Sequence, residues 1–419
     1  MKTVDAVGGL AHEGEAPGAA MTDPPQQTRR VAEVFAAFLL QGLTAFGGPT
    51  AHLGYFRRAF VERRGWISAE AFGEMLALCQ FLPGPASSQL GMAIGLRRAG
   101  LAGALAAWIG FSAPAAAAMI ALAYGAPALV AAWGTGWLHG LKLAAAAVVL
   151  QAVVAMARSL AAGPVTGGIA LGAAAGLILA QGPLGPVAAL VAGGLFGLAF
   201  LKQAAAPAVP SDYPPGRRRW AAAVLVLFVV LLVGLPPLAA ALRDPTLAMA
   251  SVFYRTGALV FGGGHVVLPL LQAEVVERGW MPRDAFLAGY GAVQALPGPL
   301  FSFAAYVGAA QRFAPGGWFG GLVALVAIYL PGLLLVLGVL PFWERLKTRP
   351  GARAALAGVN AAVVGVLAAA LWDPVLKTAV RGVGDVALIA AAFLLLTAVR
   401  LPPWAVVLGM AAAVGVAMR

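Results

Sequence analysis

Long stretches without a charged residue constrain this chain more than any other feature of its sequence. Residues 221–233 and 322–340 contain only uncharged and mostly apolar side chains. Of all 419 residues, 61% are hydrophobic and 11% are charged, whereas a soluble domain carries about 25% charged residues. A helix needs about 20 apolar residues to cross the hydrocarbon core of a bilayer. The sequence therefore predicts an integral membrane protein.

The apolar segments predict helices and exclude a membrane barrel. Backbone groups find no water at membrane depth, so only helices or a closed barrel satisfy their hydrogen bonds. The segments are unbroken runs of Ala, Leu, Gly and Val without the strict alternation that a barrel strand needs. We expect an all-α polytopic membrane protein with about 13 hydrophobic segments. They lie at 31–48, 72–95, 102–125, 138–157, 165–181, 183–201, 220–241, 246–264, 286–310, 316–342, 354–372, 384–399 and 402–418.

The segments divide into two halves between a tail and a linker. Residues 1–30 hold acidic residues, prolines and glycines without an apolar core, which predicts a disordered N-terminal tail. We expect one repeat over 31–201 and a second over 246–419. The linker, 202–245, is rich in proline near its start, carries three consecutive arginines and contains one extra span.

Basic residues dominate the charge, which is formally +12. They occur in short clusters between apolar runs, which indicates cytoplasmic loops rather than a nucleic-acid partner. If the N-terminus is cytoplasmic and every segment crosses, cytoplasmic stretches hold 17 Lys and Arg and external stretches hold nine. This count places Arg98 inside and Arg64 outside. It favours a cytoplasmic N-terminus.

The two halves repeat a set of short motifs in the same order over about 40 residues. For the first and then the second half, the motifs are FGGP 46–49 and FGGG 261–264, VER 61–63 and 276–278, GW 65–66 and 279–280, and PGP 83–85 and 297–299. Such order indicates an internal duplication. Six segments per half plus one linking span would invert the second half, a frequent design in transporters with a site at the membrane midplane.

The two Pro-Gly-Pro motifs predict broken helices. Proline removes an amide donor and glycine permits unusual backbone angles. A break at membrane depth is tolerated where it is buried in protein or lines a polar cavity, and the N-termini of the resulting half-helices attract anions. A simple kink is the alternative. The candidate substrate-binding residues here are Pro83, Gly84, Pro85, Ser87, Ser88, Pro297, Gly298 and Pro299.

The glycine motifs that end the first segment of each half could form a second pair of broken helices. Close helix packing through glycine is the alternative. A histidine follows each motif and could bind an anion or respond to pH, or could be hydrogen-bonded for structural reasons. The two histidines do not align in the repeat. The candidates are Phe46, Gly47, Gly48, Pro49, His52, Gly262, Gly263 and His265.

Three ionisable residues within or beside apolar segments are further candidates, because charges at membrane depth are costly and usually functional. Glu74 could couple transport to a proton, or could lie at the membrane edge. Lys142 and Arg255 could face an anion, or could extend to the interface.

The sequence lacks signatures for a cofactor or a metal. It has no Gly-x-x-x-x-Gly-Lys-Ser/Thr loop for ATP. The single cysteine, Cys79, excludes a multi-thiolate metal site. We therefore expect neither a cofactor nor a metal.

Taken together, the motif order resembles the chromate ion transporter family in its long two-domain form. The matching sequences are FGGPTAH, ERRGW and QFLPGP, followed by FGGGH, ERGW and QALPGP. The resemblance covers nearly the whole chain after the tail. It implies that the protein is no enzyme but exports chromate, a tetrahedral dianion, through the bacterial inner membrane by using the proton-motive force, and so confers chromate resistance. It also implies that the motif residues named above contact the anion.

Other functions stay open at this stage. The protein could carry sulfate or another oxyanion, or it could be a passive anion channel. More remotely, PGPASS at 83–88 resembles a loop of lipid-diphosphate phosphatases, but residues 86–93 lack the arginine and acidic pair that such chemistry needs. The expected partners are a small oxyanion and membrane lipids. A homo-oligomer is compatible with the sequence.

Overall fold

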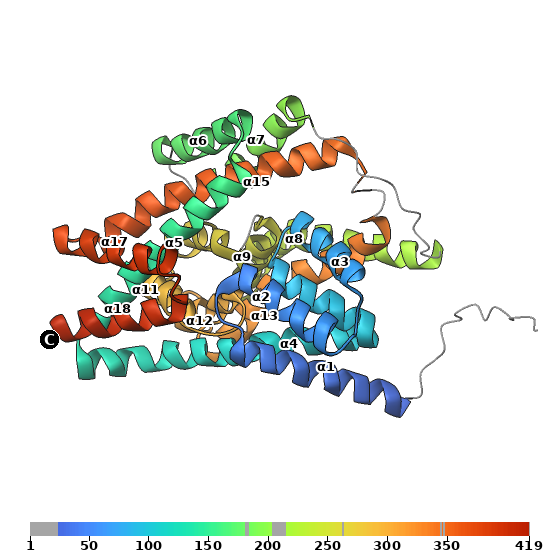
Figure 1. The fold of residues 1–419 in the computed structure, drawn as a ribbon, viewed down its shortest axis with the longest axis horizontal. Helices are drawn as coiled ribbons and strands as arrows, with labels where there is room; N and C mark the ends of the chain where they lie inside the picture. Colours follow the sequence, from blue (N-terminus) through green and yellow to red (C-terminus); the bar gives the residue numbers. More distant parts are fainter. Residues whose placement is uncertain are drawn as a thin grey trace, which may run out of the picture.

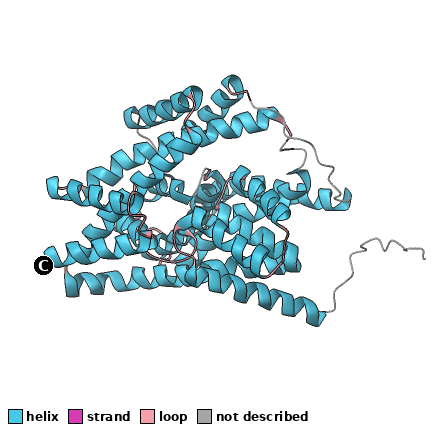
Figure 2. Cartoon of the chain, viewed as in Figure 1, coloured by secondary structure: helices cyan, strands magenta, loops and turns pink. Residues whose placement is uncertain are grey.

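The computed structural model describes residues 24–180, 184–202, 215–261, 264–343, 346 and 348–418. In these residues the chain forms helices joined by short loops, and no strand occurs among them (Figure 2). In chain order, the elements of the first half are α1 (Pro24–Thr44), α2 (Gly48–Phe56), the π-helix η1 (Arg57–Arg63), α3 (Ala69–Phe81), α4 (Ala86–Trp133), α5 (Gly136–Leu160), α6 (Pro164–Leu179) and α7 (Gly185–Phe200).

The second half follows after α8 (Pro215–Leu242) and repeats this order (Figure 1). Its elements are α9 (Pro245–Leu259), η2 (Gly264–Val266), α10 (Val267–Val275), α11 (Arg283–Val293), η3 (Leu300–Ser302), α12 (Phe303–Ala310), α13 (Gly317–Val339), η4 (Leu340–Phe342), α15 (Pro350–Ala370), η5 (Leu371–Leu376), α16 (Lys377–Ala379), α17 (Val383–Thr397) and α18 (Pro403–Ala417).

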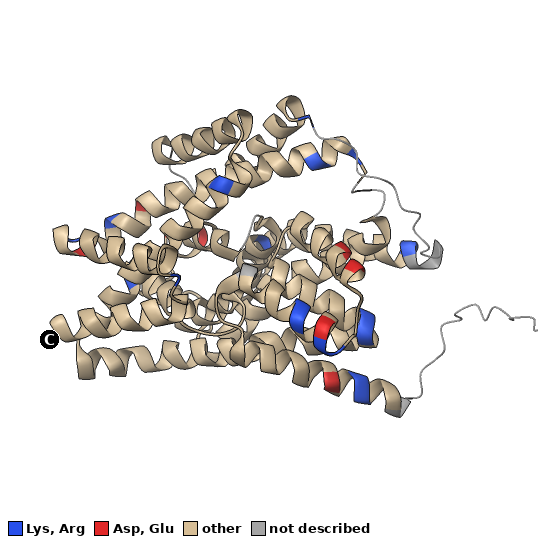
Figure 3. Ribbon diagram, in the orientation of Figure 1, with Lys and Arg blue, Asp and Glu red and all other residues tan. Residues whose placement is uncertain are grey.

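Five helices of the described residues have the length and apolar composition needed to cross a bilayer. They are Ala86–Trp133, Gly136–Leu160, Arg218–Leu242, Gly317–Phe342 and Pro350–Ala379. Shorter apolar helices accompany them, and most of the helical surface carries no charge (Figure 3). Helix α1 begins at Pro24 and therefore includes residues 24–30 of the predicted tail, whose residues 1–23 lie outside the described part.

Both Pro-Gly-Pro motifs break the helices in which they lie, as predicted. Helix α3 ends at Phe81 and α4 begins at Ala86, so the predicted segment 72–95 is two short helices. Segment 286–310 divides in the same way between Val293 and Leu300. These breaks follow from the missing proline amides and from the positive φ angles of the two glycines.

Helix α4 reverses direction soon after the first break. Ala99 and Gly100 have non-helical backbone angles, and Gly100 has a φ of 64°. Gly95 and Gly103, on either side of this turn, approach each other so closely that neither has space for a Cβ atom. Residues 86–98 therefore pack beside the long section 101–133. Gly308 of α12 and Gly320 of α13 make the equivalent contact in the second half.

In the first half, four helix ends gather at one place. The Arg64 and Arg98 guanidinium groups both lie over the Trp66 ring, 5.7 and 5.2 Å from its centroid. Arg98 also forms an ion pair of 3.1 Å with Glu33 of α1. Arg64 and Arg98 thus lie at the same face of the molecule. The count of Lys and Arg in the sequence assigned Arg98 to the inside and Arg64 to the outside. That assignment to opposite faces was wrong, because the chain turns back at the glycine motif and at Pro-Gly-Pro instead of crossing the membrane each time.

The equivalent helix ends of the second half gather at the far end of α4. Trp280 stacks on Phe313 with 4.3 Å between ring centroids, and the Arg312 amide donates to the Trp280 carbonyl. Nearby, the Trp318 amide donates to the Tyr124 hydroxyl over 2.9 Å. Tyr124 is 24 residues beyond Gly100, or about 36 Å along a helix. The two halves therefore insert their broken helices from opposite ends of α4.

Beyond the broken helices, each half packs against the last helices of the other. Helix α5 packs against α17 and α18, and α15 packs against α6 and α7 (Figure 1). Glycines make these contacts close: Gly140 lies on the α18 backbone, and Gly358 lies between Gly193 and Gly197 of α7. The halves are interlocked rather than placed side by side.

This chain path predicts the accessibility of introduced cysteines. In a Cys79→Ala background, Arg64→Cys and Arg97→Cys should react with a membrane-impermeant thiol reagent from the same face, and Arg312→Cys only from the opposite face. All three arginines are in described loops or helix ends, and Cys79 is buried. Labelling of intact cells and of inverted vesicles measures this. Reaction of the first two variants from opposite faces would contradict the path.

Candidate functional site

The four chain breaks meet at the centre of the molecule. The Gly84 amide of the first Pro-Gly-Pro motif donates to the Val260 carbonyl over 2.6 Å. The Gly298 amide of the second motif donates to the Ala45 carbonyl over 3.0 Å. Val260 and Ala45 each directly precede the phenylalanine of a glycine motif. Each Pro-Gly-Pro break is thus bonded to the glycine break of the other half, with approximate two-fold symmetry.

The glycines at this crossing cannot be replaced without strain. Gly84 and Gly298 have φ angles of 122° and 96°, and Gly47 and Gly48 have 101° and 74°. A side chain at Gly298 would also meet the Phe111 carbonyl oxygen at 3.2 Å. Other residues rarely adopt such backbone angles.

Four buried hydroxyl groups lie beside the crossing. Ser88 and Ser302 each follow the last proline of a Pro-Gly-Pro motif by three residues. The Tyr329 hydroxyl faces both of them and also Ser112, and it interacts weakly with all three serine hydroxyl groups. All four residues are at most 2% exposed. Among the described residues, none of the four oxygens has a partner at hydrogen-bonding distance and angle.

The symmetry of the crossing extends to this hydroxyl cluster, which we define as Ser88, Ser112, Ser302 and Tyr329. Ser112 stands two residues before Pro114 in α4, and Tyr329 stands two residues before Pro331 in α13. The cluster therefore consists of two repeat-related pairs. Buried polar groups are normally satisfied, so unpartnered ones need an explanation. A group of neutral O–H donors without a charged member suits an oxyanion, whose oxygens only accept hydrogen bonds.

His52 holds the first glycine break in place. Its Nε2 lies 3.2 Å from the Ala45 carbonyl, so Nε2 carries the proton and donates. Its Nδ1 then accepts from the Ser87 hydroxyl, 3.4 Å away. Ala45 is the residue whose carbonyl also receives the Gly298 amide. This geometry corresponds to the structural alternative for His52, and Ser87 belongs to the same arrangement.

Most of the other motif residues have structural contacts with neighbouring side chains or backbone groups. The His265 Nδ1 lies 2.8 Å from the Tyr290 hydroxyl. Phe46 packs on Trp404 with 5.8 Å between ring centroids. Pro49 lies in the first turn of α2. The Pro83 carbonyl accepts from the Gln89 side-chain amide over 2.8 Å. Gly262 and Gly263 lie outside the described residues.

The three ionisable candidates do not join the hydroxyl cluster. Glu74 is exposed on α3. Lys142 is buried, and its ammonium group lies 2.7 Å from the Asp284 carboxylate. Arg255 is bonded to the Glu274 carboxylate. Lys142 and Arg255 are therefore each held by an acidic partner.

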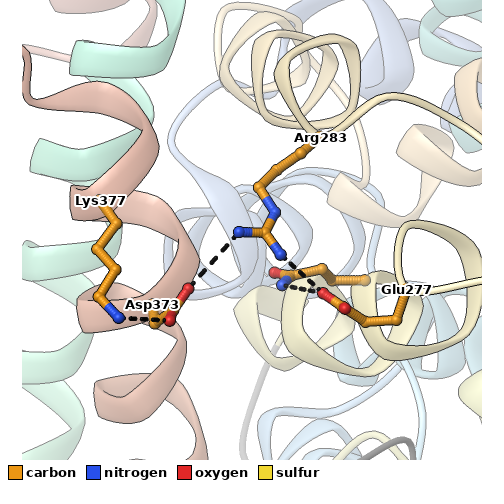
Figure 4. Close-up of polar contacts among 5 residues, drawn as sticks. Glu277, Arg283, Asp373 and Lys377 are labelled. Atoms are coloured by element: carbon orange, nitrogen blue, oxygen red, sulfur yellow. Dashed lines mark hydrogen bonds and ion pairs between the residues drawn. The ribbon is translucent and has the colours of Figure 1, made fainter. Parts of the chain in front are cut away.

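A pocket of about 410 Å³ lies away from the crossing, between α6, α10, α11 and η5. Arg283 bridges two carboxylates there, 3.0 Å from Glu277 and 3.7 Å from Asp373 (Figure 4). Lys377 binds Asp373 over 2.7 Å. Because two cations and two carboxylates neutralise one another, this pocket is a weaker candidate for an anion than the hydroxyl cluster.

Comparisons with known proteins assign the chain. The family model described as "Chromate transporter" matches residues 32–198 and again 247–416. A chromate transport protein of Pseudomonas aeruginosa is 31% identical over 371 residues, which cover 83% of this chain and 82% of that protein. A chromate transport protein of Cupriavidus metallidurans is 28% identical over 341 residues, covering 80% of each chain. No solved structure matches the chain significantly.

The hydroxyl cluster predicts an unusual response of stability to substitution. Ser88→Ala and Ser302→Ala should leave the thermal unfolding temperature unchanged or raise it, since an unpartnered buried hydroxyl costs about 1–3 kcal/mol. Gly298→Ala should lower that temperature, because its strained φ angle costs about 1–3 kcal/mol. Unfolding of the purified protein in detergent, followed by fluorescence, measures both. A large loss of stability in either serine variant would mean that its hydroxyl is already satisfied.

Proposed function

The chain belongs to the chromate transporter family, and we propose that it exports chromate through the bacterial inner membrane, with the hydroxyl cluster as its central binding site. As a member of that family it is a multi-pass membrane protein and a transporter rather than an enzyme. The export direction, the driving force and the binding residues are parts of the proposal.

One observation carries this proposal: two repeat-related helix breaks and four unpartnered hydroxyl groups meet at the centre of the molecule. Chromate has four oxygens and two negative charges, so it accepts hydrogen bonds readily. Hydroxyl groups bind it without the full attraction of a fixed positive charge. Binding that is favourable yet weak is what a conducting or carrier site needs for release.

An inverted repeat is part of the same proposal. It is supported by the insertion of the two sets of broken helices from opposite ends of α4 and by the exchanged hydrogen bonds at the crossing. In such folds a midplane site opens to each face in turn when one part rocks against the other. In this proposal Ser88 and Ser302, which are related by the repeat, lie on either side of that site.

We further propose that the first half inserts from the cytoplasmic face, which keeps the N-terminus inside. Eight arginines lie at its helix ends, whereas four lie at the equivalent ends of the second half, and cytoplasmic loops carry the excess of basic residues. The eight are Arg29, Arg30, Arg57, Arg58, Arg63, Arg64, Arg97 and Arg98, and the four are Arg243, Arg278, Arg283 and Arg312.

The membrane potential suits export of a dianion. Moving one charge through 100 mV is worth about 2.3 kcal/mol, so two charges gain about 4.6 kcal/mol when the inside is negative. That energy sustains a gradient of more than about 1,000-fold. The electrical part of the proton-motive force is thus large enough to drive export of the dianion. Collapsing the membrane potential and the pH gradient separately distinguishes their contributions.

Chromate transport into inverted membrane vesicles tests the proposal. Ser88→Ala and Ser302→Ala should each reduce initial uptake at least about tenfold, the loss expected when a hydrogen bond to a charged ligand is removed. Ser159→Ala is the matched control, because that hydroxyl is exposed and bonds its own helix. Wild-type uptake by a Ser88→Ala and Ser302→Ala double variant would refute the proposed site.

The same vesicles identify the driving force and the ion. Uptake should fall when valinomycin and potassium collapse the membrane potential. Loss only on collapse of the pH gradient would instead require proton coupling, and uptake driven by the chromate gradient alone would indicate a channel. Competition by sulfate measures how far the site distinguishes the two tetrahedral dianions.

A further inference from the structure

An arginine-lined pocket lies in each half of the molecule. The inner pocket, of about 650 Å³, lies between α1 and η1 and includes Arg58, Arg63 and Arg64. The outer pocket, of about 600 Å³, lies between α8, α9 and the end of α10 and includes Arg243, Arg255 and Arg278. Arg63 and Arg278 are both the last residue of the VER motif. The two pockets therefore share this repeat-related arginine, whereas most of their other lining residues are not repeat-related.

A buried carboxylate, Glu274, is paired with two of the arginines of the outer pocket. Glu274, which is 7% exposed, binds Arg255 through one oxygen, and its other oxygen lies 2.7 Å from Arg278. Glu274 stands four residues before Arg278. Four residues before Arg63 stands Ala59, which lines the inner pocket. No Asp or Glu is among the residues that line the inner pocket.

Two further differences set the charge of the outer pocket. Arg255 stands six residues before Phe261, and the equivalent residue before Phe46 is Leu40. Asp244 also lines the outer pocket, but its Oδ1 caps α9 by accepting from the Thr246 and Leu247 amides. Glu274 is thus the carboxylate that holds two of the three arginines there.

We propose that both pockets bind oxyanions on their way through the protein, and that Glu274 is a tethered competitor that weakens the outer one. The choice of ligand rests on the proposed function. A guanidinium fork binds a carboxylate and a tetrahedral oxyanion with the same N–H groups. An anion in the outer pocket must displace Glu274 from them, whereas an anion in the inner pocket displaces no carboxylate. Uneven affinity of this kind favours entry from inside and release outside.

Removal of the competitor tests this inference. Titration calorimetry of the purified protein with chromate, and separately with sulfate, measures binding without requiring transport. A background with Arg63→Gln, Ser88→Ala and Ser302→Ala weakens both the inner pocket and the hydroxyl cluster, so that the outer pocket is observed. In that background Glu274→Gln should tighten anion binding about tenfold, because the hydrogen bond to Arg255 and the ion pair with Arg278 no longer compete with the anion. Glu277→Gln is the matched control: it removes the same charge three residues away, and its partner Arg283 lines a different pocket (Figure 4).

Two more variants keep the test decisive. Replacing both Arg255 and Glu274 by Gln removes the charge pair together and should bind no tighter than the background. If the Glu274→Gln variant does not fold, Glu274→Asp replaces it. The aspartate side chain is one methylene shorter, so it should hold one of the two arginines less well and tighten anion binding by a smaller factor. Unchanged or weaker binding by a folded Glu274 variant, or an equal gain in Glu277→Gln, would overturn the inference.

The calorimetry tests the role of Glu274, and the transport assay tests the proposed function, so that either can fail without the other. Tighter binding by Glu274→Gln in a protein that moves no chromate would reject export and keep the outer anion pocket. Chromate transport that depends on Ser88 and Ser302, with no effect of Glu274 on binding, would keep export and reject the competitor.

Discussion

The need to satisfy backbone hydrogen bonds where water is absent governs this structure. Four interruptions of the helices leave amides and carbonyls exposed at membrane depth, and the chain satisfies them by exchange between its halves. Gly84 donates to Val260, and Gly298 donates to Ala45. Because each break depends on the opposite half, the duplicated halves form one unit, and the unpartnered hydroxyl groups are brought to the point where all four breaks meet.

Charged side chains line pockets toward the two faces of the molecule, and uncharged polar side chains lie at its centre. Arginines line the inner pocket and the outer pocket, and neutral hydroxyl groups lie at the crossing between them. Among the described residues, the buried charges of Lys142 and Glu274 are paired with Asp284 and with Arg255, respectively. Such a distribution fits the proposed path of a dianion, because an unpaired fixed charge at low dielectric would hold the dianion too strongly halfway.

Much of this architecture could be predicted from local sequence, and some of it could not. Proline and glycine chemistry is local, so the breaks at both Pro-Gly-Pro motifs were predictable. The return of the chain at the glycine motif depends on pairing with a distant segment, so Arg64 and Arg98 were assigned to opposite faces although they lie at the same one. The acidic partners of Lys142 and Arg255 are equally distant along the chain. Ser302, Ser112 and Tyr329 were overlooked, although alignment of the repeats through Pro114 and Pro331 would have identified them.

The interlocking of the halves has a consequence for biosynthesis. Helix α5 is covered by α18, whose backbone lies directly on Gly136 and Gly140. Helix α18 begins at Pro403, far beyond the end of α5 at Leu160, so α5 is synthesised long before α18. The nascent first half therefore exposes this glycine-rich surface to lipid or a chaperone until α18 has been synthesised and can pack on it.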